Sequence, residues 1–412
     1  MAPKKFDWWL TGFCAARVFN GLVFMTYAAA LPLLQKEWRM SGTQAGSIAG
    51  GFQIGYALSL IVFSTLADRI SARTVYLYSL FASGISALAF AFLARDFLTG
   101  FLFHTFLGLS LGGTYTTGIM ILAAHYQTKK RGLAVGAFIA STSCGYALSL
   151  VISGFSLPWG GYPLSFFLTC LGPILGWVVA RITLYRTVVT APERQVGQRF
   201  TKEVLGNRKA MLLIWGYVFH NWELQGMWVW TPAFLTACLS AAGASALSAV
   251  GSGANIVALF HLMGLAASLS MGILSDRFGR SQVMLIIAMV GAGCSFAFGW
   301  TLGLPLIVIT AIGLVYAFSS LGDSPILSAA LTEEMEPSYL GAALGLRSLL
   351  GFGGAAIAPL VFGAVLDWSN PLLNGQRQYL SWGWAFSLLG LGGLGAVWTI
   401  GRYRLSKNHV KN

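Results

Sequence analysis

Long apolar segments separated by short polar ones run along the whole chain. Each of twelve such segments is about 20 residues long or longer, enough to cross a hydrocarbon layer about 30 Å thick as a helix. No soluble domain is expected, because the longest polar gap covers only about residues 187–209. The pattern predicts membrane-spanning helices at 8–35, 44–66, 74–94, 98–125, 133–156, 163–186, 210–238, 250–274, 282–301, 304–331, 339–366 and 380–401.

Composition and charge fit this pattern. Hydrophobic residues make up 56% of the chain and charged residues 9%, whereas about a quarter of the residues in a soluble domain are charged. A formal charge of +13 would suit nucleic acid, but 20 of the 26 Lys and Arg residues fall in alternate loops, on one predicted side. The positive-inside rule therefore predicts cytoplasmic termini and explains the charge without a nucleic-acid partner. The first segment has no cleavage site after it, so we expect a permanent span.

The five cysteines indicate neither a disulfide framework nor a metal site. They all lie inside predicted spans, with no C-x-x-C or Cys/His spacing among them. We therefore expect the cysteines to be packing residues, and we expect no metal and no cofactor. They are Cys14, Cys144, Cys170, Cys238 and Cys294.

An internal repeat divides the chain into two halves. The loop from Ser64 to Arg73 follows the second span, and a similar loop from Gly272 to Arg280 follows the eighth. Asp68 and Asp276 in these loops are 208 residues apart, about half the chain. A repeat of this size is typical of carriers built from duplicated helix bundles. We expect one bundle at 1–186, a basic cytoplasmic linker at 187–209 and a second bundle at 210–412.

These two loops resemble the G-x-L-x-D-R-x-G-R signature loop of the major facilitator superfamily, and the resemblance covers the whole chain. It implies an all-α membrane protein with 12 transmembrane helices in two six-helix bundles and both termini in the cytoplasm. It also implies a secondary transporter that works by alternating access, and not an enzyme. We expect a monomer in the lipid bilayer of a bacterial cytoplasmic (inner) membrane.

The chain departs from the family pattern at three places. Ser64 and Ser71 replace glycines of the first loop, and His104 stands in span 4 where many members carry arginine. Span 5 reads Ser141 to Ala147 without the proline motif of proton-driven antiporters. The family's arginine role is therefore not transferred to span 4, and an export pump is disfavoured.

The resemblance implies a gating role for the loop residues. Asp68 would face the N-terminus of span 11 and nearby arginines, and so hold the two halves together on the cytoplasmic side. The alternative is that these residues are solvated turn residues that follow the positive-inside rule. The gating set is Asp68, Arg69, Arg73, Asp276, Arg277 and Arg280.

Four charged residues fall deep inside predicted spans, away from the span ends, where each is a candidate for function. They are Arg17, Glu223, Asp323 and Arg347. Family geometry places spans 1, 4, 7 and 10 around a central cavity, so the first three lie on cavity helices. An Asp323–Arg347 ion pair is one structural alternative, because both lie at about the same depth. Arg17 must find Glu223, a carbonyl, water or an anionic substrate.

Two arginines near mid-depth favour a small organic anion, because a guanidinium stays charged and binds carboxylates with two parallel donors. Burial disfavours a charged carboxylate, so Glu223 is the first candidate for proton coupling and Asp323 the second. Gly226 and Pro232 would loosen span 7. Gln53, Thr116 and Tyr316 would line the vestibule if they face inward. The expected substrate-binding residues are Arg17, Arg347, Asn20, Tyr115, His220 and Asn255.

The favoured function is proton-coupled symport, or anion exchange, of a small carboxylate-like solute, with protons or a counter-anion as the second partner. A proton-driven exporter of drugs or metabolites with the same fold is the alternative. A membrane enzyme or sensor is disfavoured, because the sequence carries no nucleophile with its base, no phosphate-binding loop and no soluble output domain.

Overall fold

A computed structural model describes residues 6–126, 128–187, 201–372 and 378–408, and these residues form helices and short connections without a β-strand. A short π-helix, Thr201–Leu205, precedes the second half. The all-α fold class is confirmed. The long helices are α1 (Trp8–Gly21), α2 (Thr26–Glu37), α3 (Gly42–Arg69), α4 (Ala72–Leu93), α5 (Phe97–His125), α6 (Thr128–Thr183), α7 (Arg208–Ala241), α8 (Ala246–Phe278), α9 (Arg280–Phe298), α10 (Leu306–Glu334), α11 (Pro337–Ser369) and α12 (Gly383–Asn408).

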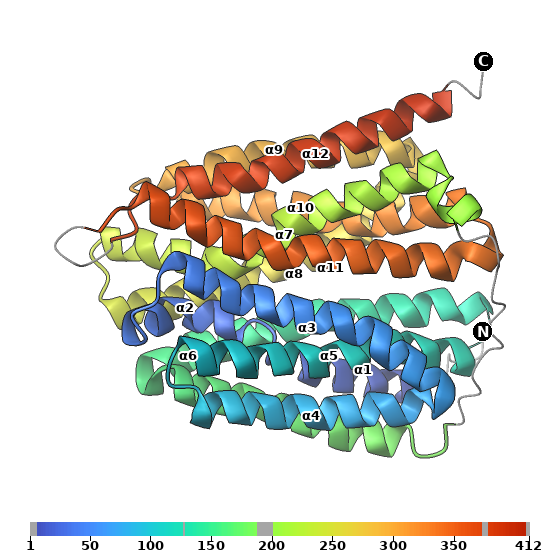
Figure 1. The fold of residues 1–412 in the computed structure, drawn as a ribbon, viewed down its shortest axis with the longest axis horizontal. Coiled ribbons are helices and arrows are strands. Elements are labelled where there is room, and N and C mark those ends of the chain that lie inside the picture. Colours follow the sequence, from blue (N-terminus) through green and yellow to red (C-terminus); the bar gives the residue numbers. More distant parts are fainter. Residues whose placement is uncertain (1–5, 127, 188–200, 373–377, 409–412) are drawn as a thin grey trace.

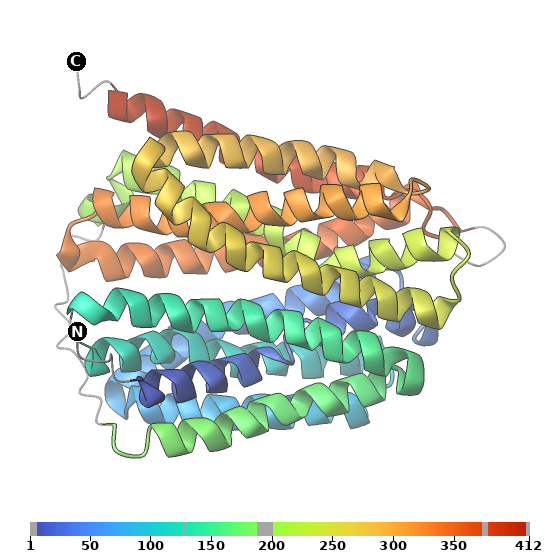
Figure 2. The same cartoon turned by 180° about the vertical axis from the view of Figure 1, so that it is seen from behind.

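Helix α6 contains two of the expected spans. Its 56 residues would extend over about 80 Å at 1.5 Å per residue, far more than one crossing of a bilayer. The chain reverses at Gly160 and Gly161, and Gly161 has φ 62° and ψ −163°, a conformation suited to glycine. Figure 2 shows the first limb in teal leading to this reversal and the second limb in green running back from it.

Ten described segments are long and apolar enough to cross a membrane. One of them, Leu133–Thr183, holds both limbs of α6, and α7 is a further long helix outside the ten. Counted in this way, the described chain makes the twelve crossings that hydropathy predicts. The protein is a multi-pass integral membrane protein.

The first span is broken, which the sequence analysis did not anticipate. Helix α1 ends at Gly21, and α2 begins at Thr26 after a four-residue interruption. Gly21 lies against Gly145 of α6, where a Cβ would be 3.0 Å from the Gly145 Cα. The expected loosening of span 7 is not seen, because α7 runs unbroken through Gly226 and Pro232. The helix break near the centre of the molecule is therefore in span 1.

The helices form two bundles that meet along a central interface. Figure 1 shows α1–α6 in the lower half and α7–α12 in the upper half. Helix α3 packs against α11, α6 against α8, and α2 against α7 across this interface. Helix α1 begins and α12 ends at the same end of the molecule (Figures 1 and 2). We name this the termini end and its opposite the far end.

The two bundles are tightly packed at the far end. A Cβ on Gly50 of α3 would lie 2.5 Å from the Ala356 carbonyl oxygen of α11, so this contact requires glycine. Asp367 of α11 caps the first turn of α3: it accepts hydrogen bonds from the backbone N–H groups of Gly42 and Thr43, both at 2.8 Å, and from the Thr43 hydroxyl at 2.7 Å. A carboxylate suits this helix N-terminus.

The same face of α11 is uncovered towards the termini end. Phe352 contacts Tyr56 of α3, with 4.9 Å between the ring centroids. Gly345 lies seven residues earlier, two helical turns along the same face. No atom lies within 4 Å of the position of a Cβ on Gly345, and the residue is exposed. The bundles are therefore closed at the far end and separated at Gly345.

Candidate substrate site

Arg17 of α1 is a buried cation held by neutral groups. Its Nε donates to the Thr142 hydroxyl and its Nη1 to the Thr114 hydroxyl, both at 2.9 Å. The guanidinium carbon lies 5.2 Å from the ring centroid of Phe138 and 5.7 Å from that of Tyr115. Within the described chain, no ion pair of 4.0 Å or less joins Arg17 to a carboxylate. Its positive charge therefore lacks an acidic partner among these residues.

Asn20 belongs to the same group. It lies on α1 one turn beyond Arg17, and its amide nitrogen donates to the same Thr114 hydroxyl at 2.9 Å. Thr114 donates its own hydrogen to the Leu111 carbonyl. The Asn20 Oδ1 is buried and has no hydrogen-bond partner. The amide oxygen of Asn20, at the end of α1, is thus a free hydrogen-bond acceptor near the buried Arg17 cation.

Three tyrosines link Arg17 to the second arginine. Tyr115 of α5 lies near Arg17, Arg347 and Tyr217. Tyr56 of α3 lies near Arg17, Tyr115 and Tyr217. Because Tyr217 belongs to α7, this phenol group spans the interface between the bundles.

Arg347 of α11 supplies the cation of the second bundle. Its Nη1 donates to the Ser328 hydroxyl at 2.7 Å, and its guanidinium carbon lies 4.2 Å from the Tyr217 ring centroid. Its Nε is buried without a hydrogen-bond partner. As with Arg17, a hydroxyl and an aromatic ring hold the charge, and within the described chain no carboxylate pairs with it.

The Asp323–Arg347 ion pair, which the sequence left open as a structural alternative, is not formed. The Asp323 carboxylate lies 2.9 Å from Nδ1 of His220, and both side chains are buried. Neighbouring helices in sequence are not neighbours in the bundle: α11 packs mainly on α3 and α7, and much less on α10. Tyr217 covers Arg347, and His220 meets Asp323 one turn further along α7. Equal depth was therefore insufficient to predict the pair.

Glu223 faces the interior of the second bundle. Its Oε1 accepts a hydrogen bond from the Ser295 hydroxyl of α9, and the same hydroxyl contacts the Tyr316 hydroxyl of α10, both at 2.5 Å. A Cβ on Gly393 of α12 would lie 3.1 Å from Oε2. Glu223 also interacts electrostatically with Asp323 and His220. Glu223, Asp323 and His220 therefore form one buried group within the second bundle.

Asn255 lies apart from the arginines. A Cβ on Gly154 of α6 would collide with its amide oxygen, so Asn255 sits in the contact between α6 and α8. Of the six expected substrate-binding residues, the structure brings together Arg17, Asn20, Tyr115 and Arg347. His220 is one turn away beside Asp323.

Residues of the second signature loop form ion pairs within their own bundle. Arg280 lies 3.0 Å from Asp276 and 2.5 Å from Glu333 of α10. Lys407 of α12 lies 3.9 Å from Glu333 and 3.4 Å from Glu334. The gating role of this loop stays a prediction, as does that of Asp68, Arg69 and Arg73 at the termini end.

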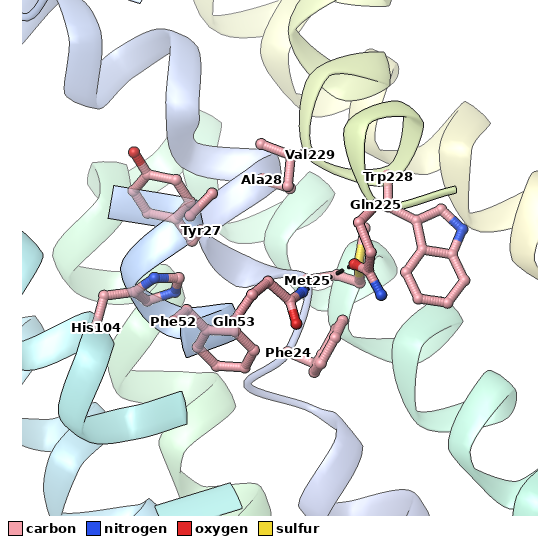
Figure 3. Close-up of a pocket in the computed structure, with 11 residues that line it drawn as sticks. Phe24, Met25, Tyr27, Ala28, Phe52, Gln53, His104, Gln225, Trp228 and Val229 are labelled. Atoms are coloured by element: carbon pink, nitrogen blue, oxygen red, sulfur yellow. Dashed lines mark hydrogen bonds between the residues drawn. The ribbon is translucent and has the colours of Figure 1, made fainter. Parts of the chain in front are cut away.

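A small pocket joins the two bundles beyond the tyrosines. Its walls include Phe24, Phe52 and Trp228, and it has a volume of about 20 Å³. Figure 3 shows Gln53 of α3 reaching Gln225 of α7 inside this pocket, where the Gln53 amide nitrogen donates to the Gln225 oxygen at 2.9 Å. His104, the residue that departs from the family pattern, lines it as well.

Several residues of the site were missed by the sequence analysis. They are the partners that hold the arginines and Glu223, and each is a Ser, Thr or Tyr in an apolar helix, where a single hydroxyl carries no distinguishing pattern. They are Tyr56, Thr114, Thr142, Tyr217, Ser295 and Ser328. Among the described residues, no group of three His, Cys, Asp or Glu could hold a metal ion.

Comparison with known proteins identifies relatives along most of the chain. The model of the Major Facilitator Superfamily matches residues 13–255. The niacin transporter NiaP of Acinetobacter baylyi is 23% identical over 84% of this chain and 83% of its own length. The gentisate transporter of Corynebacterium glutamicum is 23% identical over 88% and 83%. The 4-hydroxybenzoate transporter PcaK of Pseudomonas aeruginosa is 24% identical over 93% and 88%.

Solved structures share the fold at low sequence identity. The crystal structure of the nucleoside transporter NupG gives a TM-score of 0.76 at 15% identity and covers 96% of this chain and 99% of its own. A bacterial homologue of the human lysosomal transporter Spinster, in an inward-facing and unoccupied conformation, gives 0.74 at 16% identity, with 96% and 95% covered. At this identity the likeness extends to the fold alone.

Proposed function

The chain belongs to the Major Facilitator Superfamily, and from that premise we propose that this inner-membrane transporter carries a small organic anion, whose carboxylate binds between Arg17 and Arg347. Family membership and transporter relatives make it a carrier and not an enzyme. The observation behind the substrate class is the pair of buried arginines, one in each bundle, that both lack an acidic partner within the described chain.

A carboxylate suits these two arginines for a physical reason. Removing a cation from water is unfavourable unless a counter-charge or several hydrogen bonds replace the water. Hydroxyls take up two of the donors on Arg17 and one on Arg347, and a guanidinium has five. An anion bound between them would use the remaining donors and would also pull the two bundles together.

The names of the relatives support the same class. Niacin, gentisate and 4-hydroxybenzoate, the solutes named for three relatives, are planar ring carboxylates. The phenol rings of Tyr56, Tyr115 and Tyr217 beside the arginines offer faces on which such a ring can stack.

Coupling to protons is proposed for the buried group of Glu223, Asp323 and His220. His220 and Tyr217 both lie on α7, and the Tyr217 ring contacts Arg347. A change in the protonation of this group can therefore shift the position of Arg347 through α7 and this aromatic contact. Symport with protons is the proposed mode, and exchange against a counter-anion would use the same arginines. Under the predicted cytoplasmic termini, the present conformation faces inward, and Asp68 is proposed to close the cytoplasmic side in the opposite state.

Uptake into proteoliposomes tests the proposal. We expect the wild-type protein to take up radiolabelled benzoate-type acids and Arg17→Gln or Arg347→Gln to reduce uptake at least about 100-fold, since each removes a charged hydrogen bond to the anion. Arg95→Gln is the matched control, because Arg95 is exposed at the far end. The idea fails if both arginine variants leave anion transport intact.

A further inference from the structure

We propose that the Gln53–Gln225 amide pair selects, among ring carboxylates, those that carry a neutral hydrogen-bonding group on the ring, such as a hydroxyl or a ring nitrogen. This inference rests on the proposed function above. It makes Gln53 and Gln225 specificity-determining residues at the end of the site opposite the arginines.

The pair leaves hydrogen-bonding capacity unused. One bond joins the amides, and Gln53 Oε1 is buried with no partner. His104 Nε2, which belongs to another residue of the same pocket, is also buried without a partner. The exposed fraction is 3% for Gln53, His104 and Gln225 alike. Buried polar atoms are nearly always hydrogen-bonded, so a ligand group or a water is expected here.

The pocket is shaped for one polar atom beside an aromatic ring. Its volume of about 20 Å³ is enough for about one water-sized group. Phe24 and Phe52 stand edge to face, with 5.2 Å between their centroids. In Figure 3 the Gln53 oxygen and the Gln225 amide nitrogen both lie below the bond that joins the amides, on the side of Phe24. They offer an acceptor and a donor to the same ring substituent.

The distance to the arginines suits a single ring. Gln53 precedes Tyr56 by three residues on α3, a rise of about 5 Å, and Tyr56 interacts with Arg17. Phe52, a wall of the pocket, stacks on Tyr56 with 6.3 Å between the ring centroids, and Tyr56 in turn lies near Arg17. A ring whose carboxylate binds the arginines would point its opposite substituent at the amide pair.

The pair also belongs to the contact between the bundles. Gln53 and Gln225 come from different halves, and they lie on the termini side of the Gly50–Ala356 contact. Two roles can therefore be separated. A pair that only joins the halves would affect every substrate equally, whereas a selective pair would affect substrates according to their ring substituent.

The test compares benzoate with 4-hydroxybenzoate as substrates of the full-length protein in proteoliposomes. We expect the wild-type protein to prefer 4-hydroxybenzoate, and Gln53→Met and Gln225→Met each to reduce the ratio of the two kcat/KM values about tenfold, the effect of one hydrogen bond. Benzoate uptake should stay within about threefold of wild type, which also reports that each variant folds. Gln282→Met, at an exposed position of α9, should leave the ratio unchanged.

Three outcomes separate the hypotheses. Loss of the preference in both pocket variants supports the inference. A wild-type protein without preference, or a preference that survives in both variants, overturns the inference and leaves the proposed function standing. If the wild-type protein takes up neither acid, the proposed function fails, and the inference that rests on it fails too.

Discussion

At the scale of single residues, the buried arginines and the buried carboxylates of this protein have different neighbours. Arg17 and Arg347 contact hydroxyls and aromatic rings, whereas Glu223 and Asp323 contact Ser295 and His220. Direct neutralisation would have been the simple arrangement for four charges in a membrane. Under the proposed function, this separation leaves the arginines to bind the substrate and the acids to bind protons.

Glu223→Gln should separate transport from proton coupling. The amide keeps a hydrogen-bond acceptor for Ser295 but cannot release a proton. We expect proton-driven accumulation of the anion to fall to the equilibrium level, while anion exchange stays within about twofold of wild type. Accumulation against a pH gradient and counterflow in the same proteoliposomes measure the two activities. The exposed Glu37→Gln is the control, and wild-type accumulation by the Glu223 variant would exclude Glu223 as the coupling residue.

Candidate residues could be predicted from the sequence only by type and depth. Charge inside an apolar segment identifies Arg17, Glu223, Asp323 and Arg347. Their partners depend on which face of each helix points inward and on which helices are neighbours. Asn255 shows the limit: it was expected in the site, yet it lies in the α6–α8 contact.

At the scale of elements, two local features determine the course of the chain. The reversal within α6 depends on Gly161, and the closed far end includes a carboxylate from one bundle at the N-terminus of a helix in the other. For each feature, the same substitution at another position of the chain serves as the control.

Gly161→Ala should destabilise the fold. Residue 161 has a positive φ, and holding a non-glycine residue in such a region costs about 1–3 kcal/mol. We expect the thermal midpoint in detergent to drop. Gly136→Ala is the same substitution within α6, at a helical position with open space around the Cβ, and there alanine should be neutral or stabilising. Equal thermal midpoints for the two variants would show that a methyl side chain at residue 161 does not strain the turn.

Asp367→Asn should weaken the far-end closure. The change removes the charge beside the N-terminus of α3, which is worth about 0.3–1 kcal/mol, and it leaves one accepting oxygen in place of two. Spin labels at Gln44→Cys and Trp368→Cys, in a background without native cysteines, would report the distance between α3 and α11. We expect a larger population at long distance.

Asp96→Asn provides the comparison, because Asp96 caps α5 within the first bundle by accepting a bond from the Thr99 backbone at 2.9 Å. It should leave the measured distance unchanged. An unchanged distance in the Asp367 variant as well would mean that the glycine contacts alone hold the far end closed.

At the scale of the whole molecule, the two bundles touch at one end and separate at the other. Ala356 is buried against Gly50 of α3, while Gly345 on the same face of α11 is exposed. Under the proposed function, this asymmetry is one state of an alternating-access cycle, and the predicted topology would place the open end in the cytoplasm.

Cysteine accessibility tests both the state and the topology. In a cysteine-free background, Gly345→Cys should react with a membrane-impermeant maleimide in inside-out vesicles and not in right-side-out vesicles. Ala356→Cys should stay unreactive in both. Labelling of Gly345→Cys from the outside would contradict the predicted orientation, and its protection on both sides would contradict an open termini end.

The lipid environment, the number of crossings and the internal repeat can be predicted from the sequence alone. These follow from composition, segment length and a motif that recurs after 208 residues, all of which are local or additive properties of the chain. The break in span 1, the contact of Asp323 with His220 and the contact of Gln53 with Gln225 are seen only in the folded structure. Side-chain packing between distant segments decides which helices are neighbours and which face of each helix points inward. Hydropathy does not predict either property. The sequence therefore predicts the two buried arginines, but only the structure shows that no acid pairs with them in the described chain.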